Sequence, residues 1–564
     1  MYHIQKILPT RLHDKRRFRR LALISLMIII FLFVILSLAT PFWSSLGPRH
    51  PSKPANKGTS AVVRRINIPD FQNSAVPFDQ TAIFWFGAVS SSDNYVDVRM
   101  GYNNSELYVD LHIVDRYLWY DPNAKGPDLT TGDTATVYLN TTQNGSNAPD
   151  QSAYKFVAQV DWYQPRTYYQ QAYRGNGSTW VVSPIAFTAV SGWRGTGFNG
   201  KEDAGWTMTY HIPFSSLGQA GPPSQGTPWK LGIQVHNQDN ASDTPLSLKW
   251  WPETADDLLP SSWGVLVFGL PTYQAPQTTN NAPYTVRNGL NNQVVTDGMV
   301  GGSLGCYNKG LNRWTGLGGQ SYPGATRVNI QNEWDISDWN CFSKFYISFP
   351  LTSLPAGQGV VSAKVTLYEF GNSGTKGKPT PSLIEVASVN EGWDPATLAW
   401  NNAPLVKENI STTVVNIMPG AIIYPGQPYS WDVSKALADA YAAGQPLRLV
   451  FYSSDSAYNT GKYFFSSTIP DWNATGRPTL QATLGNIATS SSASVQSSAS
   501  LAAVTPAARG QRVALGGLAL DNQQTLPPAK VDGYILYLSP LIIFPAPLFF
   551  LLWTLQRRRL IKQG

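Results

Sequence analysis

Five tryptophans in the first half of the chain lie among polar residues that can form hydrogen bonds. An indole offers a flat apolar surface on which the C–H face of a pyranose ring stacks, while amides and carboxylates bind the sugar hydroxyls. This chemistry makes the following residues candidates for carbohydrate binding: Trp119, Trp180, Trp193, Trp250, Trp251, Asn237 and Asp239. Each tryptophan has the alternative role of core filler in a two-sheet sandwich.

The adjacent Trp250 and Trp251 are the most informative pair, because consecutive side chains of a strand point to opposite faces. At most one of the two can therefore belong to a core. Residues 233–237 and 248–251 read as neighbouring strands joined by a polar turn. We expect Asn237 or Asp239 to stand beside the exposed tryptophan as a hydrogen-bonding partner.

Catalytic motifs are missing from the sequence. It has no H-E-x-x-H pattern, no Walker-type loop and no Cys/His cluster. Residues 301–305 match the G-x-S-x-G pattern of a nucleophile elbow, but that elbow needs a histidine later in the chain, and the last one, His236, precedes Ser303. We therefore predict a protein that is not an enzyme.

Two long apolar runs predict membrane spans. Residues 21–40 form an uncharged stretch of about the length that crosses a bilayer, and seven Lys or Arg residues precede it. The second run, at 534–553, is followed by four basic residues. Because basic residues favour the cytoplasmic side, both termini should lie in the cytoplasm and the bulk of the chain outside the plasma membrane. The alternative for the first run is a cleaved signal peptide.

The net charge of +7 belongs to the tails. The first twenty residues carry a net +6 and the last eight +4, which leaves −3 for the rest. The high isoelectric point therefore does not indicate a nucleic-acid-binding surface. The two cysteines, Cys306 and Cys341, both lie in the outside portion, where a disulfide between them can form and persist.

Composition divides the chain into two strand-rich regions with polar segments around them. Short alternating runs separated by turn residues indicate two β-sandwich domains of jelly-roll type, an all-β ectodomain held between two transmembrane helices. A helix over 435–443 is expected, with Asp432 or Ser434 as its cap and Gly444 at its end. The expected segments are a basic tail (1–20), a span (21–43), a stalk (44–65), the first sandwich (66–271), a linker (272–285), the second sandwich (286–485), a disordered tether (486–533), a span (534–555) and a basic tail (556–564).

The first sandwich resembles family 9 carbohydrate-binding modules. The motifs that carry the resemblance are Val114-Asp115, GDTATVYLN at 132–140, GIQVHNQD at 232–239, LKWWP at 248–252 and SWGVLVF at 262–268. The resemblance implies a jelly-roll or DOMON-like sandwich that often binds sugars, sometimes with structural calcium. Because some DOMON-like domains hold a b-type haem through Met and His or Lys, these residues are haem-ligand candidates: Met100, Met208, His112 and His211.

The second sandwich is similar to the DNRLRE domain, which is related to family 96 carbohydrate-binding modules. The matching motifs are FYISFPLTSLPA at 345–356, VSAKVTLY at 361–368, WDPATLAWNNAP at 393–404, WDVS at 431–434 and RPTL at 477–480. This resemblance implies a β-sandwich of bacterial surface and secreted proteins, with acidic polysaccharide as one attested ligand class.

Together these observations predict a cell-surface protein that binds a polysaccharide or cell-wall glycan without catalysis. Its expected partners are a glycan and the membrane, and not nucleic acid. Two alternatives remain: a structural or adhesive surface protein without a sugar pocket, and a haem-binding DOMON-like protein.

Overall fold

The computed structural model describes residues 62–161, 168–242, 248–301, 306, 311–373, 379–418, 420, 423–458 and 460–488. The predicted membrane spans, both basic tails and most of the stalk and tether lie outside these residues. Within the described ranges, no helix is both long and apolar enough to cross a bilayer.

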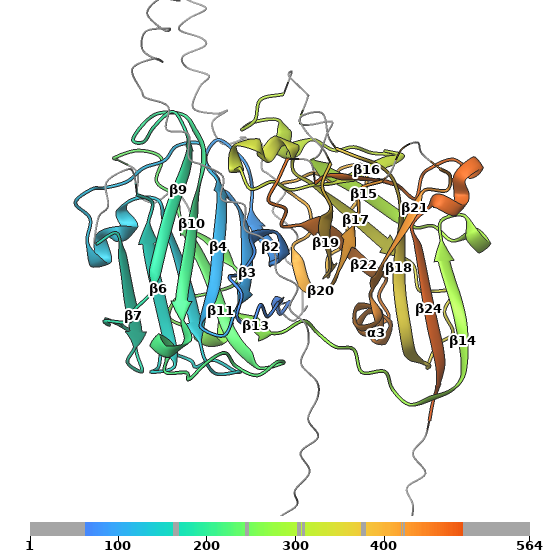
Figure 1. Ribbon diagram of the computed structural model, residues 1–564, viewed down its shortest axis with the longest axis horizontal. Helices are drawn as coiled ribbons and strands as arrows, with labels where there is room; N and C mark the ends of the chain where they lie inside the picture. Colours follow the sequence, from blue (N-terminus) through green and yellow to red (C-terminus); the bar gives the residue numbers. More distant parts are fainter. Residues whose placement is uncertain are drawn as a thin grey trace, which may run out of the picture. The chain divides into compact units, whose positions relative to one another are not determined.

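The first sandwich consists of two antiparallel sheets (Figure 1). The sheet with the order β2-β3-β4-β10-β9 is built from β2 (Ala82–Gly87), β3 (Tyr95–Tyr102), β4 (Glu106–Val114), β9 (Thr188–Gly195) and β10 (Asp203–Pro213). The facing strands are β13 (Gly264–Phe268), β11 (Pro228–His236), β5 (Thr134–Asn140), β6 (Ala153–Gln159), β7 (Gln170–Gly175) and β8 (Trp180–Val182), with β12 (Leu248–Trp251) paired to β11.

The second sandwich also has two sheets. One is formed by β15 (Thr296–Gly301), β17 (Ser343–Phe349), β22 (Leu447–Ser453), β19 (Ser382–Val389) and β20 (Val406–Val415). The other is formed by β14 (Thr278–Arg287), β24 (Thr479–Ile487), β18 (Gly359–Asn372), β23 (Lys462–Phe465) and β16 (Arg327–Ile330), with β21 (Gln427–Asp432) paired to β18.

A short strand, β1 (Arg65–Ile68), joins the two sandwiches. It runs parallel to β13 along its whole length and bridges to β20 where Arg65 pairs with Glu408. Next to that bridge, the Asn67 backbone N–H donates to Asn409 Oδ1 at 2.7 Å. In the described residues the outcome is one continuous thirteen-stranded sheet that contains strands of both sandwiches.

The alternating runs of the sequence correspond to real strands, and the described residues are mainly β-structure with few helices. The predicted helix is confirmed as α3 (Ser434–Ala442). Asp432 Oδ1 accepts from the Ser434 backbone N–H at 2.8 Å at its start, and Gly444 takes a left-handed conformation (φ 62°) just after its end.

Two predicted boundaries are wrong. Strand β14 begins at Thr278 and pairs with β24, so most of the segment 272–285 belongs to the second sandwich and is not a linker. Arg64, assigned to the stalk, is buried, and its Nη2 lies 2.5 Å from Glu253 and 3.1 Å from Glu391. Strand β14 resembles a linker in sequence because strand pairing holds it in place while most of its side chains stay exposed.

The five-stranded sheet is buried on both faces along β3. Every residue of β3 is buried, although its sequence alternates between apolar and polar side chains. Asp97, on the face turned away from the first core, accepts from Tyr452 Oη at 2.9 Å and from Asn332 Nδ2 at 3.2 Å. Lys344 Nζ lies 3.9 Å from the ring centroid of Trp85 in the same layer. The second sandwich therefore covers part of the outer face of the first.

Candidate functional site

Trp250 and Trp251 point to opposite faces of their sheet, as predicted. Strand β12 pairs antiparallel with β11, which places Trp250 opposite Gln234 and Trp251 opposite Ile233. Trp251 is 1% exposed, and its ring centroid lies 4.4 Å from that of Phe84 in the core. Trp251 is therefore a core residue, and its assignment as a sugar contact is wrong.

The assignment of Asn237 as the polar partner is also wrong, because Asn237 is buried. Its Oδ1 accepts from Asn94 Nδ2 at 2.7 Å, and its Nδ2 donates to Asp239 Oδ1 at 3.4 Å. Both residues belong to a polar network at the end of β11. The polar neighbours of Trp250 are instead Gln234 and, two residues further along β11, His236.

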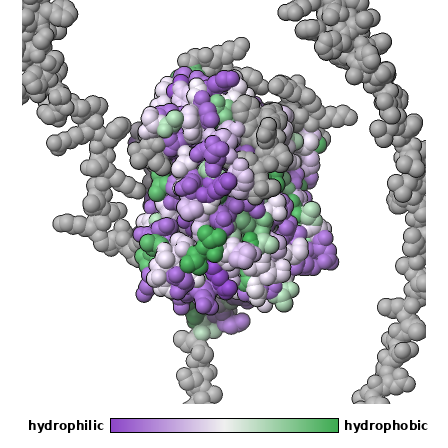
Figure 2. All heavy atoms as spheres, turned by 90° about the vertical axis from the view of Figure 1, so that its left-hand side faces the viewer, coloured by the Kyte–Doolittle hydropathy of each residue, from purple (hydrophilic) through white to green (hydrophobic). Residues whose placement is uncertain are grey.

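The outer side of this sheet carries a cluster that we call the Trp250 face. Strand register places its members side by side on β5, β6, β11 and β12, with Trp180 packed against them from β8. Its residues are Thr136, Tyr138, Lys155, Trp180, Gln234, His236 and Trp250. Figure 2, which looks onto the end of the molecule where β6 and β7 lie in Figure 1, shows a mainly hydrophilic surface interrupted by hydrophobic patches.

Tyr138 is the centre of the aromatic part of the Trp250 face. Its ring centroid lies 5.1 Å from that of Trp250 and 5.8 Å from that of Trp180. Its hydroxyl donates to Gln234 Oε1 at 2.8 Å, which fixes the ring. Trp180 is held separately, because its Nε1 donates to the Asp257 carbonyl at 3.1 Å. Trp250 and Trp180 are each half-buried, so both indoles keep surface open to a ligand.

Polar groups on the same face have unused hydrogen-bonding capacity. Within the described residues, the buried atoms Thr136 Oγ1 and His236 Nδ1 have no hydrogen-bond partner. Burial and the nearby Lys155 amine lower the pKa of His236 to about 4, so its imidazole is neutral at physiological pH. Lys155 Nζ itself lies 5.4 Å from the Tyr138 ring centroid. Aromatic surface and unpaired polar atoms therefore occur together.

The other predicted tryptophans lie elsewhere. Trp119 is half-buried in the loop after β4, where its backbone N–H donates to Asp133 Oδ2 at 2.7 Å. Trp193 is on β9 of the opposite sheet, with its ring centroid 5.2 Å from that of Phe198. Of the seven predicted residues, the structure brings only Trp250 and Trp180 together on one face.

Carboxylates near β11 do not fit a calcium site. Burial, and then Asp239, raise the pKa of Asp115 to about 8. Its Oδ2 accepts from Trp206 Nε1 at 3.1 Å, and the Asp133 oxygens accept from the Trp119 and Gln238 backbone N–H groups. All four carboxylate oxygens of Asp115 and Asp133 thus already accept hydrogen bonds from N–H groups. Among the described residues no group of three or more His, Cys, Asp or Glu is arranged to hold a metal ion.

The haem-ligand candidates are separated by the sheet itself. Met100 and Met208 are buried in the first core. His112 and His211, on β4 and β10, are opposite Thr207 and Tyr108 in the strand register, which places them on the other face. A methionine and a histidine of this set cannot reach one iron, so the haem prediction is not supported by the residues.

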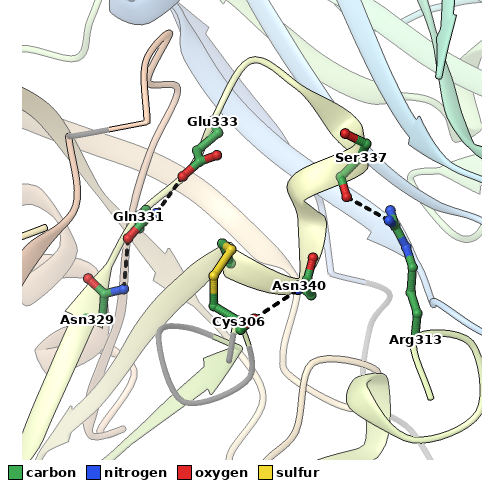
Figure 3. Close-up of a disulfide and its surroundings, with 8 residues drawn as sticks. Cys306, Arg313, Asn329, Gln331, Glu333, Ser337 and Asn340 are labelled. Atoms are coloured by element: carbon green, nitrogen blue, oxygen red, sulfur yellow. Dashed lines mark hydrogen bonds between the residues drawn. A yellow bond between two sulfur atoms is a disulfide. The ribbon is translucent and has the colours of Figure 1, made fainter. Parts of the chain in front are cut away.

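Cys306 and Cys341 are joined in a disulfide (Figure 3). Cys341 is the last residue of the 3₁₀ turn η7 (Ile336–Cys341), and Asn340 Nδ2 donates to the Cys306 carbonyl at 3.4 Å. Arg313 Nη1 donates to the Ser337 carbonyl at 2.7 Å on the other side of the turn. The disulfide and these two hydrogen bonds therefore hold η7 in place.

Tyr138, Lys155 and His236 are not among the residues predicted from the sequence. A signal was present, because Tyr138 and Lys155 are register neighbours in two predicted strands. Assigning them to the outer face needs the pairing partner of each strand, which alternation alone does not identify.

Comparisons with known proteins find carbohydrate-binding modules. The model of carbohydrate-binding module family 96 matches residues 317–473. The chain is similar to a family 9 carbohydrate-binding module from Caldicellulosiruptor kristjanssonii, solved with cellotriose (12% identity) and with glucose (13% identity). Each alignment covers 38% of this chain and 100% of that chain, with a TM-score of 0.26.

A putative carbohydrate-binding protein from Bacteroides uniformis ATCC 8492 is similar at 13% identity, over 36% of this chain and 99% of that chain, with a TM-score of 0.26. The comparison with curated proteins gives no match. The families found are carbohydrate-binding modules.

Proposed function

We propose that this chain is a non-catalytic, membrane-anchored surface protein that binds a polysaccharide or cell-wall glycan. The observation that carries the proposal is the Trp250 face, where two half-buried indoles flank Tyr138 beside unpaired polar atoms of Thr136 and His236. The match of the family 96 model to the second sandwich supports the same ligand class.

The chemistry of the Trp250 face suits a sugar. The C–H side of a pyranose stacks on an indole, and its hydroxyls both donate and accept hydrogen bonds. The neutral His236 imidazole and the Thr136 hydroxyl accept from such groups, while Lys155 donates. The next residue, Trp251, is buried and fixes β12 to the core. A rigid strand therefore presents the Trp250 indole.

Membrane anchoring is supported by the apolar runs at 21–40 and 534–553 with their basic flanks. In this arrangement both termini are cytoplasmic and both sandwiches are outside the cell. The tether and stalk then hold the glycan-binding faces away from the bilayer.

The test compares two neighbouring residues that differ in orientation. Trp250→Ala should weaken glycan binding by about 1–3 kcal/mol, the scale of an anchoring aromatic contact, and leave thermal stability nearly unchanged. Trp251→Ala is the matched control, because it empties part of the core and should cost about 3–5 kcal/mol of stability. A glycan array on the purified chain selects the ligand, and calorimetric titration gives the affinities.

The proposal fails if the array shows no glycan bound by the folded protein. That result would favour the structural or adhesive alternative. If a glycan binds and Trp250→Ala leaves its affinity intact, the ligand class stands and the Trp250 face is not the site.

A further inference from the structure

A hollow of about 550 Å³ lies on the β2-β3-β4-β10-β9 sheet of the first sandwich. Its floor is the outer side of β4, β9 and β10, and its rim includes Trp334 and Ile336 from the second sandwich. It is distinct from the Trp250 face, which is on the outer side of the β5, β6, β11 and β12 sheet. Residues from both sandwiches are needed to form it.

The floor of the hollow carries a buried acid and a buried imidazole. Asp110 is 2% exposed and His112 is 4% exposed. His112 Nε2 lies 2.9 Å from Asp110 Oδ2, and Thr209 Oγ1 donates to Asp110 Oδ1 at 2.6 Å. Within the described residues, His112 Nδ1 has no hydrogen-bond partner. Buried polar atoms are normally paired, so this nitrogen requires an explanation.

The charge balance shows what kind of group would satisfy this nitrogen. Arg99, which is opposite Asp110 in the strand register, lies buried beneath Phe78 with its Cζ 4.4 Å from that ring centroid. Its positive charge offsets the carboxylate of Asp110. With the Nε2–H of His112 directed at Asp110, Nδ1 is left as an acceptor. His112 Nδ1 is thus an open acceptor on the floor, which a hydroxyl donor would satisfy. The guanidinium nitrogens of Arg99 also have no partner within the described residues, but Arg99 lies beneath Phe78 and does not line the hollow.

Two indoles form the sides of the hollow. Trp193 lies on β9 and Trp334 comes from the second sandwich, where it is 42% exposed. Arg194 lies over Trp334, with its Cζ 5.1 Å from the ring centroid, and its Nε pairs with Asp335 Oδ2 at 3.0 Å. The Arg194 guanidinium, which Asp335 holds in place, therefore packs against the exposed Trp334 ring.

The rim from the second sandwich is fastened to the floor. Arg313 Nη2 donates to the Ala204 carbonyl of β10 at 3.1 Å, and its Nη1 donates to the Ser337 carbonyl of η7. The disulfide to Cys306 holds Cys341, the last residue of η7 (Figure 3). Such bracing holds Ile336 and Trp334 in place over the floor and makes the hollow a preorganised site.

We propose that this hollow is a second saccharide site that takes an uncharged sugar residue. A sugar hydroxyl donates to His112 Nδ1, which Asp110 keeps as an acceptor by binding the Nε2–H, and the C–H face of the ring stacks on Trp334. The proposal rests on the proposed function in taking a glycan as ligand, but it assigns a separate site that needs both sandwiches.

The experiment titrates the full chain with cellotetraose, xylotetraose and mannotetraose and counts binding sites by calorimetry. Wild type should bind two molecules of one of these sugars per chain. Trp334→Ala should remove the second site, by a roughly ten- to hundredfold loss of affinity, without a change in melting temperature. Asp110→Asn, which keeps the shape of the side chain but removes the charge that holds the proton on His112 Nε2, should weaken the same site. Trp472→Ala is the matched control, because Trp472 is a 63% exposed tryptophan outside both sites.

The outcomes separate the two proposals. If Trp334→Ala keeps two sites, or Trp250→Ala removes all binding, the hollow is not a saccharide site and the proposed function stands. If Trp334→Ala loses one site while Trp250→Ala loses none, the hollow is a saccharide site and the Trp250 face is not. Wild type that binds none of these sugars overturns the proposal of a second saccharide site.

Discussion

Glu385 lies where the two sandwiches meet and gives a pH-dependent test of that junction. It is 5% exposed on β19, and its Oε2 accepts from Asn409 Nδ2 at 3.1 Å. Asn409 in turn donates to the Asn67 carbonyl of β1. Burial raises the pKa of Glu385 from 4.5 to about 8, although Asn409 and the Ile83 N–H partly oppose this. The folded protein therefore holds a proton that the unfolded chain loses above pH 4.5.

The sign and size of the effect follow from linkage. For an acid with a raised pKa in the folded state, stability is fully present below the unfolded pKa and is lost as pH rises to the folded pKa. The two values differ by about 3.5 pH units, and each unit is worth about 1.36 kcal/mol. Glu385 should thus cost the protein roughly 5 kcal/mol between pH 4.5 and pH 8.

The variant Glu385→Gln isolates this cost because it mimics the protonated acid and does not titrate. We expect the unfolding free energy of the variant, relative to wild type, to rise steadily from pH 4.5 to pH 8 and to stay level above that. Denaturant titrations at a series of pH values measure it. Other buried carboxyls with a raised pKa, such as Asp297 and Asp455, are common to both proteins and cancel in the difference.

Glu385→Leu separates the hydrogen bond from the charge. It should show the same dependence on pH with a constant loss of about 1–3 kcal/mol, because Asn409 then lacks one acceptor. A difference between Glu385→Gln and wild type that does not change with pH would refute the reasoning and show that water reaches the carboxylate.

The remaining predictions concern the disulfide and the topology. The bond between Cys306 and Cys341 encloses 34 residues, and in the chain-entropy model its removal by the double Cys→Ser change should lower stability by about 4 kcal/mol. Free thiols titrating in the natively purified protein would contradict the bond. Protease added to intact cells should remove nearly everything between the two predicted spans and leave only the basic tails, whereas cytoplasmic exposure of a tag within 486–533 would rule out two spans.

Much of the fold follows from local sequence pattern. Short runs rich in β-branched and aromatic residues identify β4, β5, β11, β17 and β22. The alternating sequence of β3 would by itself place Asp97 and Arg99 on a solvent-exposed face, yet both are buried. Those residues are buried because the second sandwich, more than two hundred residues away in sequence, supplies Tyr452 and Asn332 to Asp97. Local pattern carries no information on such pairing.

The sequence also predicts only part of the candidate site. The adjacency of Trp250 and Trp251 determined that one indole is turned outward, and the structure shows which one. The choice of polar partner needed the register of β11 against β12, which puts Gln234 and not Asn237 opposite Trp250. The hollow at Asp110 and His112 was beyond sequence reasoning, because part of its rim comes from another domain.

The positions of the two proposed sites constrain how a glycan is held. The Trp250 face and the hollow lie on the outer sides of the two sheets of one sandwich, and these sides point in opposite directions. One short sugar chain cannot lie on both, because the sandwich core separates them. Occupied together, the sites would hold two separate glycan segments. Attachment to a glycan mesh then gains strength from two weak contacts, since the second segment binds at a high effective concentration once the first is held.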